Sequence, residues 1–428
     1  MEKNVKSIIL AAGKGTRMKS ETPKVLHKIF NKELLGYVLD EVNKTGEIAQ
    51  NFVIVGHKAE EVENFVAKNY ENSKCLLQSP QLGTGHAAYQ AYEDLKGFEG
   101  EVLILCGDTP LLTAETLKKF IENHRKNHAA LSVMSAIFEN PQNYGRIIRD
   151  ENGSLRAIVE EKDANAAQKA VKEVNTGVYL LDWAKISPAF LSLDSNNAQG
   201  EYYLTDIVKW AISNDLKAQS FILENNDESF GINSKAHLAQ AAKILKNRVI
   251  NKLLDDGVTI VDPETTYISP DTQIAPDVII YPCTYIEGKN KIAKDCKIGP
   301  FARLRGGVEL GEGVKIGNFV EIKNSKIKNH TNVSHLSYVG DSDLGSNVNI
   351  GAGTITANYN HATKEKFRTK INDGASTGSN SVLVAPVELG ENASIGAGTV
   401  VSKDIPAFAL GLTRAPLKIF ADWFKKMK

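Results

Sequence analysis

The sequence predicts an α/β domain of Rossmann-like topology that is followed by a parallel β-helix. Two patterns indicate this combination. In residues 1–233, short apolar runs rich in β-branched residues alternate with amphipathic stretches, as they do in βαβ units. From about residue 257 onward, aliphatic residues recur at every sixth position, a period that suits short strands joined by tight turns around a prism.

Length and composition exclude several classes of protein. A chain of 428 residues is long enough for roughly two or three domains, each with its own core. Lys and Arg together number 51, as do Asp and Glu, so we expect no nucleic-acid partner and no attraction to anionic membranes. The four cysteines form no C-x-x-C pair, and nowhere do about 18 apolar residues follow one another. We therefore expect no disulfide framework, no membrane span and a cytoplasmic location.

Apolar runs in the first part predict the strands of a mostly parallel sheet. They are Ser7–Leu10, Phe52–Val55, Val102–Leu105 and Leu131–Met134. The stretch Ala114–Asn127 is amphipathic, which predicts a helix packed on that sheet.

A single amphipathic helix is predicted to connect the two parts. In residues 234–256, apolar residues from Leu238 to Leu253 recur at steps of three and four among Lys, Asn and Gln. This helix divides the chain into a first domain, 1–233, and a second domain, 257–428.

The second domain begins with ten aliphatic residues, from Ile268 to Ile322, in unbroken steps of six. Three such steps make one coil of 18 residues, in which the aliphatic side chains point inward and stack from coil to coil. The pattern continues, with slips in phase, to Val401, except in 357–370, where polar and basic residues break the register. Such a break predicts a loop that leaves the solenoid, either on its binding face or as an insertion without function. The tail 419–428 predicts a short helix over the open end of the array.

The most specific local motif is Leu10–Met18, L-A-A-G-K-G-T-R-M, which directly follows an apolar run and precedes Pro23 and Lys24. Glycines let backbone N–H groups approach an anion, while Arg17 and Lys24 supply positive charge. The pattern is neither the Walker A motif nor a Rossmann G-x-G-x-x-G. It resembles the signature of sugar-1-phosphate nucleotidyltransferases.

That resemblance implies a site for UTP and a sugar phosphate. It implies that the Gln78 amide recognises uracil, and that Asp108 and Asn233 hold Mg²⁺. Arg17 and Lys24 are the implied catalytic cations, which stabilise the charge that spreads over the phosphates. The nucleotide and sugar residues implied by the resemblance are Leu10, Ala11, Ala12, Gly13, Lys24, Gln78, Gly83, Thr84, Cys106, Gly107, Asp108, Gly145, Glu160, Asn175 and Asn233.

The β-helix carries candidate chemistry of its own. Arg305 and Lys323 are 18 residues apart, so they lie one above the other on successive coils, an arrangement that suits a phosphate. Paired surface charges without a ligand are the alternative interpretation. His335 comes two residues after the inward-facing Val333, so it is not a core residue. Because its ordinary pKa is near neutrality, it can act as the base that takes a proton from an attacking amine, although a lone histidine is more often a surface residue.

The order of these segments, with H-L-S-Y at 335–338 and G-A-G-T-I-T-A-N-Y at 351–359, resembles a family of bifunctional enzymes. Its members acetylate glucosamine 1-phosphate with acetyl-CoA and then transfer UMP from UTP to the product. The resemblance implies a left-handed β-helix, a homotrimer, and His335 as the general base with Glu321 orienting it. It implies an amino-sugar phosphate and acetyl-CoA site of Arg305, Glu321, Lys323, Tyr338, Asn349, Ala352, Asn358, Tyr359, Lys366, Ser379, Ala397 and Arg414, with Lys364 as the alternative to Lys366.

Two other functions remain open from the sequence. In the first, the chain is a monofunctional nucleotidyltransferase whose β-helix only assembles the protein; a scaffold has no need of His335, Lys323 or Arg414. In the second, it is a sensor that binds a sugar nucleotide without turnover. The joint presence of Arg17 and Asp108 with the other site residues of the first domain argues against that function.

Overall fold

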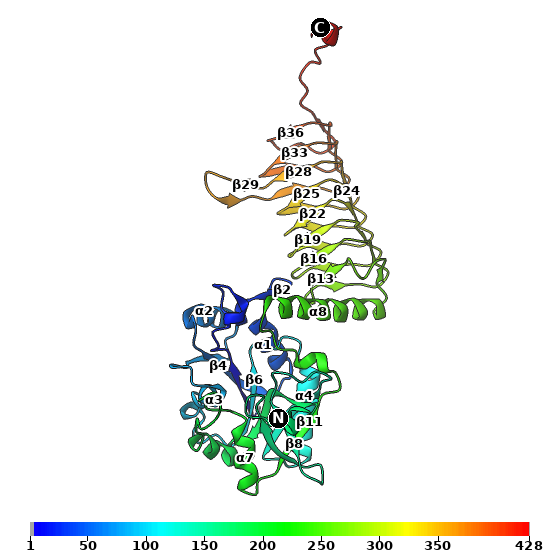
Figure 1. Cartoon of the computed structure of the whole chain (residues 1–428). Coiled ribbons are helices and arrows are strands. Elements are labelled where there is room, and N and C mark those ends of the chain that lie inside the picture. Colours follow the sequence, from blue (N-terminus) through cyan, green and yellow to red (C-terminus); the bar gives the residue numbers. More distant parts are fainter. Residues whose placement is uncertain (1–3, 428) are drawn as a thin grey trace. The chain divides into compact units, whose positions relative to one another are not determined.

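The computed structural model describes residues 4–427 and comprises two compact units, which divide between Ile244 and Leu245 (Figure 1). Residues 1–3 and 428, at the ends of the predicted first domain and tail, lie outside the described residues, as does the side chain of Phe424.

The first unit is built on a nine-stranded sheet. Seven strands follow the order β11-β7-β10-β6-β1-β4-β5, and β8 and β9 extend the sheet beside β10. The strands are β1 (Val5–Leu10), β4 (Ile48–Val55), β5 (Ser73–Leu77), β6 (Glu101–Cys106), β7 (Leu131–Ile137), β8 (Arg146–Arg149), β9 (Leu155–Val159), β10 (Glu173–Asp182) and β11 (Ala218–Ile222). Two short strands, β2 (Lys28–Ile29) and β3 (Lys32–Glu33), form a separate antiparallel pair.

The seven-strand path is mostly parallel, as predicted, because β7 and β11 are parallel to each other and run in the same direction as β6. The sheet is nevertheless mixed. Strands β1, β4, β5 and β6 are parallel, but β10 runs antiparallel to both β6 and β7. The hairpin β8–β9 is also antiparallel. The direction of β10 was not predicted, because an apolar run indicates burial on both faces of a sheet and carries no information about strand direction.

Helices cover the sheet. Ile8 packs with Phe52 in one hydrophobic cluster, whereas Ile9 packs with Val53 in another, so alternate residues of β1 and β4 face opposite sides of the sheet. The helices are α1 (Leu34–Lys44), α2 (Ala59–Asn69), α3 (Thr84–Tyr89), α4 (Ala114–Lys126), α5 (Ala166–Lys169), α6 (Trp183–Ile186) and α7 (Asp206–Ser213), with 3-10 turns η1 (Thr16–Met18), η2 (Lys24–Leu26), η3 (Glu93–Leu95), η4 (Ser187–Leu191) and η5 (Asn226–Ser229).

The long helix α8 (Lys235–Asp255) occupies the segment where the connecting helix is predicted, and the two units divide within it. It is followed by Gly257, whose φ of +88° lies in a region that glycine adopts without steric cost. None of the helices that the structure describes is both long enough and apolar enough to cross a membrane.

The second unit is a parallel β-helix with three faces (Figure 1). The first face holds β12 (Thr259–Ile260), β15 (Ile279–Ile280), β18 (Lys297–Ile298), β21 (Lys315–Asn318), β24 (Asn332–His335), β27 (Asn349–Ile350), β32 (Ser376–Thr377), β35 (Ser394–Ile395) and β37 (Leu410–Gly411). The second holds β13 (Tyr267–Ile268), β16 (Tyr285–Glu287), β19 (Arg303–Arg305), β22 (Glu321–Lys323), β25 (Tyr338–Gly340), β28 (Ile355–Ala357), β33 (Val382–Val384) and β36 (Val400–Val401). The third holds β14 (Gln273–Ile274), β17 (Lys291–Ile292), β20 (Glu309–Leu310), β23 (Lys326–Ile327), β26 (Ser342–Leu344), β31 (Thr369–Ile371) and β34 (Val387–Leu389).

The aliphatic residues that recur at every sixth position form the core of this unit. Ile286 pairs with Leu304, and Leu304 pairs with Ile322, so each aliphatic residue stacks on the one 18 positions earlier, and all three are fully buried. At the slip in phase, one coil is shorter by one residue: Leu310 pairs with Ile327, which is 17 positions later and not 18. The aliphatic column therefore continues through the slip, and Ile322, Ile327 and Val333 are all buried.

The break in the array is an antiparallel hairpin, β29 (Tyr359–Asn360) and β30 (Glu365–Lys366), which leaves the side of the column (Figure 1). The tail differs from the prediction of a helix that covers the open end. It holds only the 3-10 turn η6 (Trp423–Met427), and the side chains of Leu417, Ile419 and Phe420 are exposed. Within one chain, these apolar residues do not cover the last coil.

Candidate functional sites

The glycine-rich turn follows β1 at the edge of the sheet. Ala12 O accepts hydrogen bonds from Gln81 Nε2 at 2.8 Å and from the backbone N–H of His57 at 3.2 Å, so the turn is fixed to neighbouring segments. Gly15 has φ +59°, and a Cβ atom there would lie 2.7 Å from Cβ of Lys24. Glycine is required at this position because the Lys24 side chain crosses its backbone.

Lys24, Asp108 and Asn233 meet at this edge, although they are far apart in the sequence. The Lys24 ammonium contacts the Asp108 carboxylate and donates to Asn233 Oδ1 at 3.4 Å. The backbone N–H of Ile232 donates to Asp108 O at 3.0 Å, which joins the two segments that carry the oxygen atoms. The three predicted residues therefore converge on one point, where two oxygen donors surround a cation. Arg17 lies on η1 and is exposed.

Metal-binding capacity here rests on those two oxygen donors. Within residues 4–427, no group of three or more His, Cys, Asp or Glu side chains is arranged to hold an ion. Carboxylate and amide oxygens are nevertheless the ligands that Mg²⁺ prefers, usually one or two of them together with substrate phosphates. The position of the Lys24 ammonium indicates that the site between Asp108 and Asn233 favours a cation.

The predicted uracil-binding residue, Gln78, is buried and held in one orientation. Its Nε2 donates to Gly83 O at 3.0 Å and lies 3.1 Å from Nδ1 of His86. Both amide hydrogens are thereby directed inside the protein, and Oε1 is left to accept from a ligand. Burial lowers the pKa of His86, which favours the neutral ring. Sequence reasoning did not assign His86 a role; its position one turn into the helix after Gly83 was the available signal.

The predicted sugar-binding residues lie together at β8, β9 and β10. Asn175 N donates to Gly145 O at 2.8 Å, and its Nδ2 donates to the Tyr179 hydroxyl at 2.8 Å. A Cβ atom on Gly145 would lie 3.3 Å from Oε1 of Glu160, so the absence of a side chain leaves room for that carboxylate. Thr205 Oγ1 donates to Glu160 Oε1 at 3.4 Å, and burial raises the pKa of Glu160.

Two neighbouring groups also shape this region. Arg146 is fully buried next to Gly145, and its Nη2 pairs with Glu161 at 2.6 Å. Cys106 ends β6, and burial raises the pKa of its thiol to about 12, so it remains a neutral part of the wall.

In the β-helix, the predicted phosphate-binding residues form a cluster of cations on the second face. Arg305 and Lys323 end paired strands, and Arg305 donates to Glu321 at 2.9 Å. The hairpin brings Lys366 to Lys323: the contact between the two amines, with burial and Arg305, lowers the pKa of Lys323. The structure therefore favours Lys366 over Lys364 as the lysine that the hairpin contributes.

Tyr338 completes this face. It pairs with Glu321 across β22 and β25, and a Cβ atom on Gly340 would lie 2.3 Å from the Tyr338 hydroxyl. Glycine at 340 thus lets the phenol ring of Tyr338 lie flat along the strand, over Gly340. Gly340 in turn pairs with Lys323 on the neighbouring strand.

His335 has a different partner from the one predicted. Its Nδ1 lies 3.0 Å from Oδ1 of Asn318, and the two residues pair across β21 and β24 on the first face. Glu321, the expected orienting residue, lies on the second face and pairs with Arg305 instead. The correction follows from the coil: residues on neighbouring coils of one face stack, whereas Glu321 lies beyond the corner.

The remaining predicted residues divide between two places. Ala352, Ser379 and Ala397 occupy successive coils of one corner, where Asn380 N donates to Ala352 O at 2.7 Å and Gly398 N donates to Ser379 O at 2.8 Å. Asn349 lies on the first face, as His335 does, while Tyr359 lies in the hairpin and Arg414 in the exposed tail. Asn358 is buried and donates to Asp341.

Comparison with family models agrees with this division. Residues 6–234 match the nucleotidyl transferase family, and residues 291–324 and 368–403 match the bacterial transferase hexapeptide family, whose model spans six repeats. Fold and sites together define a transferase in which a nucleotidyltransferase domain precedes a left-handed β-helix of hexapeptide repeats.

Curated relatives match almost the whole chain, and each is named bifunctional protein GlmU. The protein from Streptococcus thermophilus is 41% identical over 442 residues, which cover 96% of this chain and 95% of the relative. Those from Acetivibrio thermocellus and Clostridioides difficile are 40% identical over 453 and 456 residues, covering 98% and 99% of this chain and 97% and 98% of the relatives. The chain belongs to the GlmU family.

Proposed function

We propose that this protein is a bifunctional enzyme that makes UDP-N-acetylglucosamine. Its β-helix acetylates glucosamine 1-phosphate with acetyl-CoA, and its first unit then transfers UMP from UTP to N-acetylglucosamine 1-phosphate and releases pyrophosphate. The observation that carries the proposal is the presence, in one GlmU-family chain, of two separate clusters of charged residues, one in each unit. One lies at Lys24, Asp108 and Asn233, and the other at Arg305 and Lys323.

Uridyl transfer is an in-line displacement at the α-phosphorus of UTP. A phosphate oxygen of the sugar phosphate forms the new P–O bond, and the bond to the β-phosphate oxygen breaks, so pyrophosphate leaves with the electron pair. Lys24 and Arg17 stabilise the charge on the phosphates, Gln78 binds the uracil, and Glu160 with Asn175 binds the sugar. Positioning and electrostatics supply the catalysis, without a covalent intermediate.

The Asp108 carboxylate and the Asn233 amide oxygen fit Mg²⁺, because both are hard oxygen donors already placed around a cation. When bound there, Mg²⁺ neutralises phosphate charge. The flexible Lys24 side chain then pairs with the triphosphate instead of with Asp108.

In acetyl transfer, the amino group of glucosamine 1-phosphate attacks the thioester carbonyl of acetyl-CoA. The new N–C bond forms, the C–S bond breaks, and CoA leaves as the thiolate. His335 takes the proton from the amine at Nε2, because its Nδ1 is engaged with Asn318. Arg305, Lys323 and Lys366 hold the sugar phosphate.

The proposed assembly is a homotrimer of β-helices. His335 and Asn349 lie on the first face and the cations on the second, while Arg414 is exposed in the tail. A neighbouring column packed at this corner would bring such groups together from two chains. A cytoplasmic location accords with the substrates and with four free cysteines.

The test is mass spectrometry of the product formed from glucosamine 1-phosphate, acetyl-CoA, UTP and Mg²⁺, with each component omitted in turn. We expect UDP-N-acetylglucosamine only from the complete mixture. Uridyl transfer to supplied N-acetylglucosamine 1-phosphate, without acetylation of glucosamine 1-phosphate, would leave the β-helix as a scaffold and refute the bifunctional proposal.

A further inference from the structure

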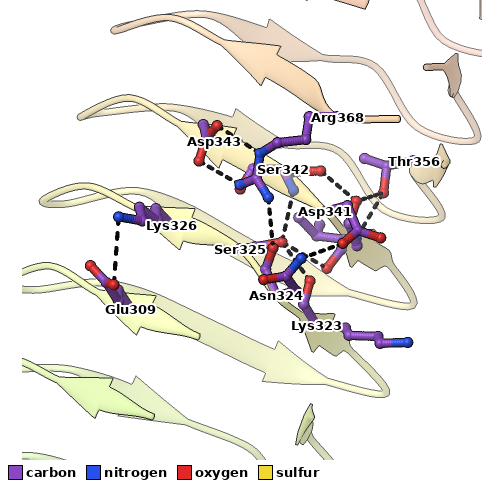
Figure 2. A network of polar contacts seen from close by, with 12 residues as sticks. Glu309, Lys323, Asn324, Ser325, Lys326, Asp341, Ser342, Asp343, Thr356 and Arg368 are labelled. Carbon is purple, nitrogen blue, oxygen red and sulfur yellow. Dashed lines mark hydrogen bonds and ion pairs between the residues drawn. The ribbon is translucent and has the colours of Figure 1, made fainter. Parts of the chain in front are cut away.

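A buried carboxylate lies one coil above Lys323 in the β-helix, where it contacts the amide side chain of Asn324 (Figure 2). It belongs to Asp341, which directly follows β25 and is only 5% exposed. We propose that Asp341 is a positioning residue for acetyl transfer: it fixes the base of the hairpin and places a negative charge beside Lys323. This inference rests on the proposed function of the β-helix.

Both carboxylate oxygens of Asp341 accept amide hydrogens. Asn324 Nδ2 donates to Oδ1, and Asn358 Nδ2 donates to Oδ2 (Figure 2 shows the first contact). Because each carboxylate oxygen accepts from a different amide, the two donors hold the carboxylate in one orientation. Asp341 is therefore a fixed anion between two amide side chains.

The Asp341 backbone joins the hairpin to the coil that carries Lys323. Its N–H donates to Lys323 O at 2.9 Å, and its carbonyl accepts from Thr369 N at 3.1 Å, just after the hairpin. On the entering side, Asn358 O accepts from Phe367 N at 2.9 Å. The Asp341 side chain binds Asn358, where the chain enters the hairpin, and its backbone binds Thr369, where the chain returns to the coil. The position of the hairpin relative to Lys323 therefore depends on Asp341.

The charges around Lys323 give the carboxylate a second effect. Lys366 from the hairpin and Arg305 from the coil below both lower the pKa of Lys323, while Asp341 raises it. Arg305 is already paired with Glu321 at 2.9 Å and lies 3.6 Å from Glu287, so the charge of Asp341 acts mainly against the contact between Lys323 and Lys366. Asp341 thus opposes the lowering of the Lys323 pKa by Lys366, by burial and by Arg305.

Asp341→Asn separates these effects from a loss of fold. The backbone has φ +48°, which asparagine tolerates, so the substitution preserves the turn. It removes the charge and turns an NH₂ group toward either Asn324 or Asn358. We expect the KM for glucosamine 1-phosphate to rise about tenfold, as for a lost charge-assisted hydrogen bond. We also expect the alkaline limb of kcat/KM for glucosamine 1-phosphate to move to lower pH.

Asp341→Glu and Glu309→Gln complete the experiment. Asp341→Glu keeps the negative charge but moves the carboxylate away from its two amide donors. It should therefore raise the KM for glucosamine 1-phosphate and leave the alkaline limb of kcat/KM in place. The second is the matched control: it removes one charge from a half-exposed carboxylate, 3.6 Å from Lys326 on the third face, and should behave as the wild type (Figure 2).

The outcomes distinguish the two levels of the proposal. A pH limb that does not move in Asp341→Asn would reduce Asp341 to a structural residue, and wild-type kinetics in that variant would refute both roles. Wild-type protein that acetylates no amino-sugar phosphate, while still transferring UMP, would overturn the proposed function of the β-helix and this inference with it.

Discussion

The Nδ1 atom of His335 lies 3.0 Å from Oδ1 of Asn318, one coil below on the same face of the β-helix. An amide oxygen can only accept a hydrogen bond, so this contact requires the ring proton on Nδ1. The lone pair is then on Nε2, where the ring is exposed and can meet a substrate amine. Asn318 therefore selects the tautomer that a general base needs.

We predict that Asn318→Ala lowers kcat of acetyl transfer by about tenfold or more and leaves both KM values nearly unchanged. His335→Ala should cost about 10²- to 10⁴-fold, the range for loss of a general base. Steady-state kinetics with glucosamine 1-phosphate and acetyl-CoA measure both effects. Uridyl transfer serves as the control and should be unaffected, because it occurs in the other unit. Equal kcat in Asn318→Ala and the wild type would contradict the role of this contact.

Removal of divalent metal is predicted to separate the two activities. Chelation with EDTA should abolish uridyl transfer and leave acetyl transfer intact, and added Mg²⁺ should restore the first. Asp108→Ala should lose uridyl transfer even with excess Mg²⁺, because one of the two oxygen donors is gone. Retained uridyl transfer in that variant would exclude Asp108 from the metal site.

The arrangement of the β-helix followed from the sequence because inward residues must repeat with each strand and turn. The partner of His335 could have been found in the same way. Once the array loses one residue before Ile327, the position one coil below is 17 residues back, which is Asn318. The prediction of Glu321 was wrong because it ignored the corner between faces. Lys366, by contrast, lies in a hairpin outside the repeat, where no register places a side chain.

In the first unit, the sequence predicted the place of the site but not all of the contacts that build it. The glycine-rich motif located the edge of the sheet, and Lys24 and Asp108 converge there. The antiparallel direction of β10 was not predictable, since Val178–Leu181 is as apolar as a parallel strand. The burial of Arg146 was not predictable either, because it depends on Glu161, a contact across two strands that no short motif encodes.

Glu160 should give uridyl transfer an acidic limb. Burial is the main reason that its pKa is raised, so it takes up a proton at a higher pH than an exposed carboxyl would. We expect the KM for N-acetylglucosamine 1-phosphate to rise as pH falls through this pKa, because the protonated group accepts hydrogen bonds from sugar hydroxyls less well. Glu160→Gln should remove that limb and raise KM at neutral pH. An acidic limb that persists in the variant would assign it to another group.

The same pKa has a consequence for stability. A carboxyl with a higher pKa in the folded than in the unfolded state binds protons more tightly when folded. Its ionised form therefore destabilises the fold above that pKa, and the penalty disappears as pH falls through it. Glu160→Gln should accordingly raise the Tm of the first unit at neutral pH, with a smaller gain in mild acid. Calorimetry at two pH values measures the difference, and an equal gain at both would contradict the argument.

Ile322→Ala is expected to destabilise the β-helix and disturb its phosphate site together. Ile322 is fully buried between Leu304 and Val339, and its own strand carries Glu321 and Lys323. Truncation leaves a cavity that costs about 2–5 kcal/mol, whereas Ile322→Val should cost only about 0.5–1.5 kcal/mol. Because the chain has two units, denaturant unfolding should show the shift in one transition and leave the other unchanged. At a denaturant concentration below that transition, acetyl transfer should fall in Ile322→Ala while uridyl transfer persists. A shift of both transitions by the same amount would mean that the two units unfold as one.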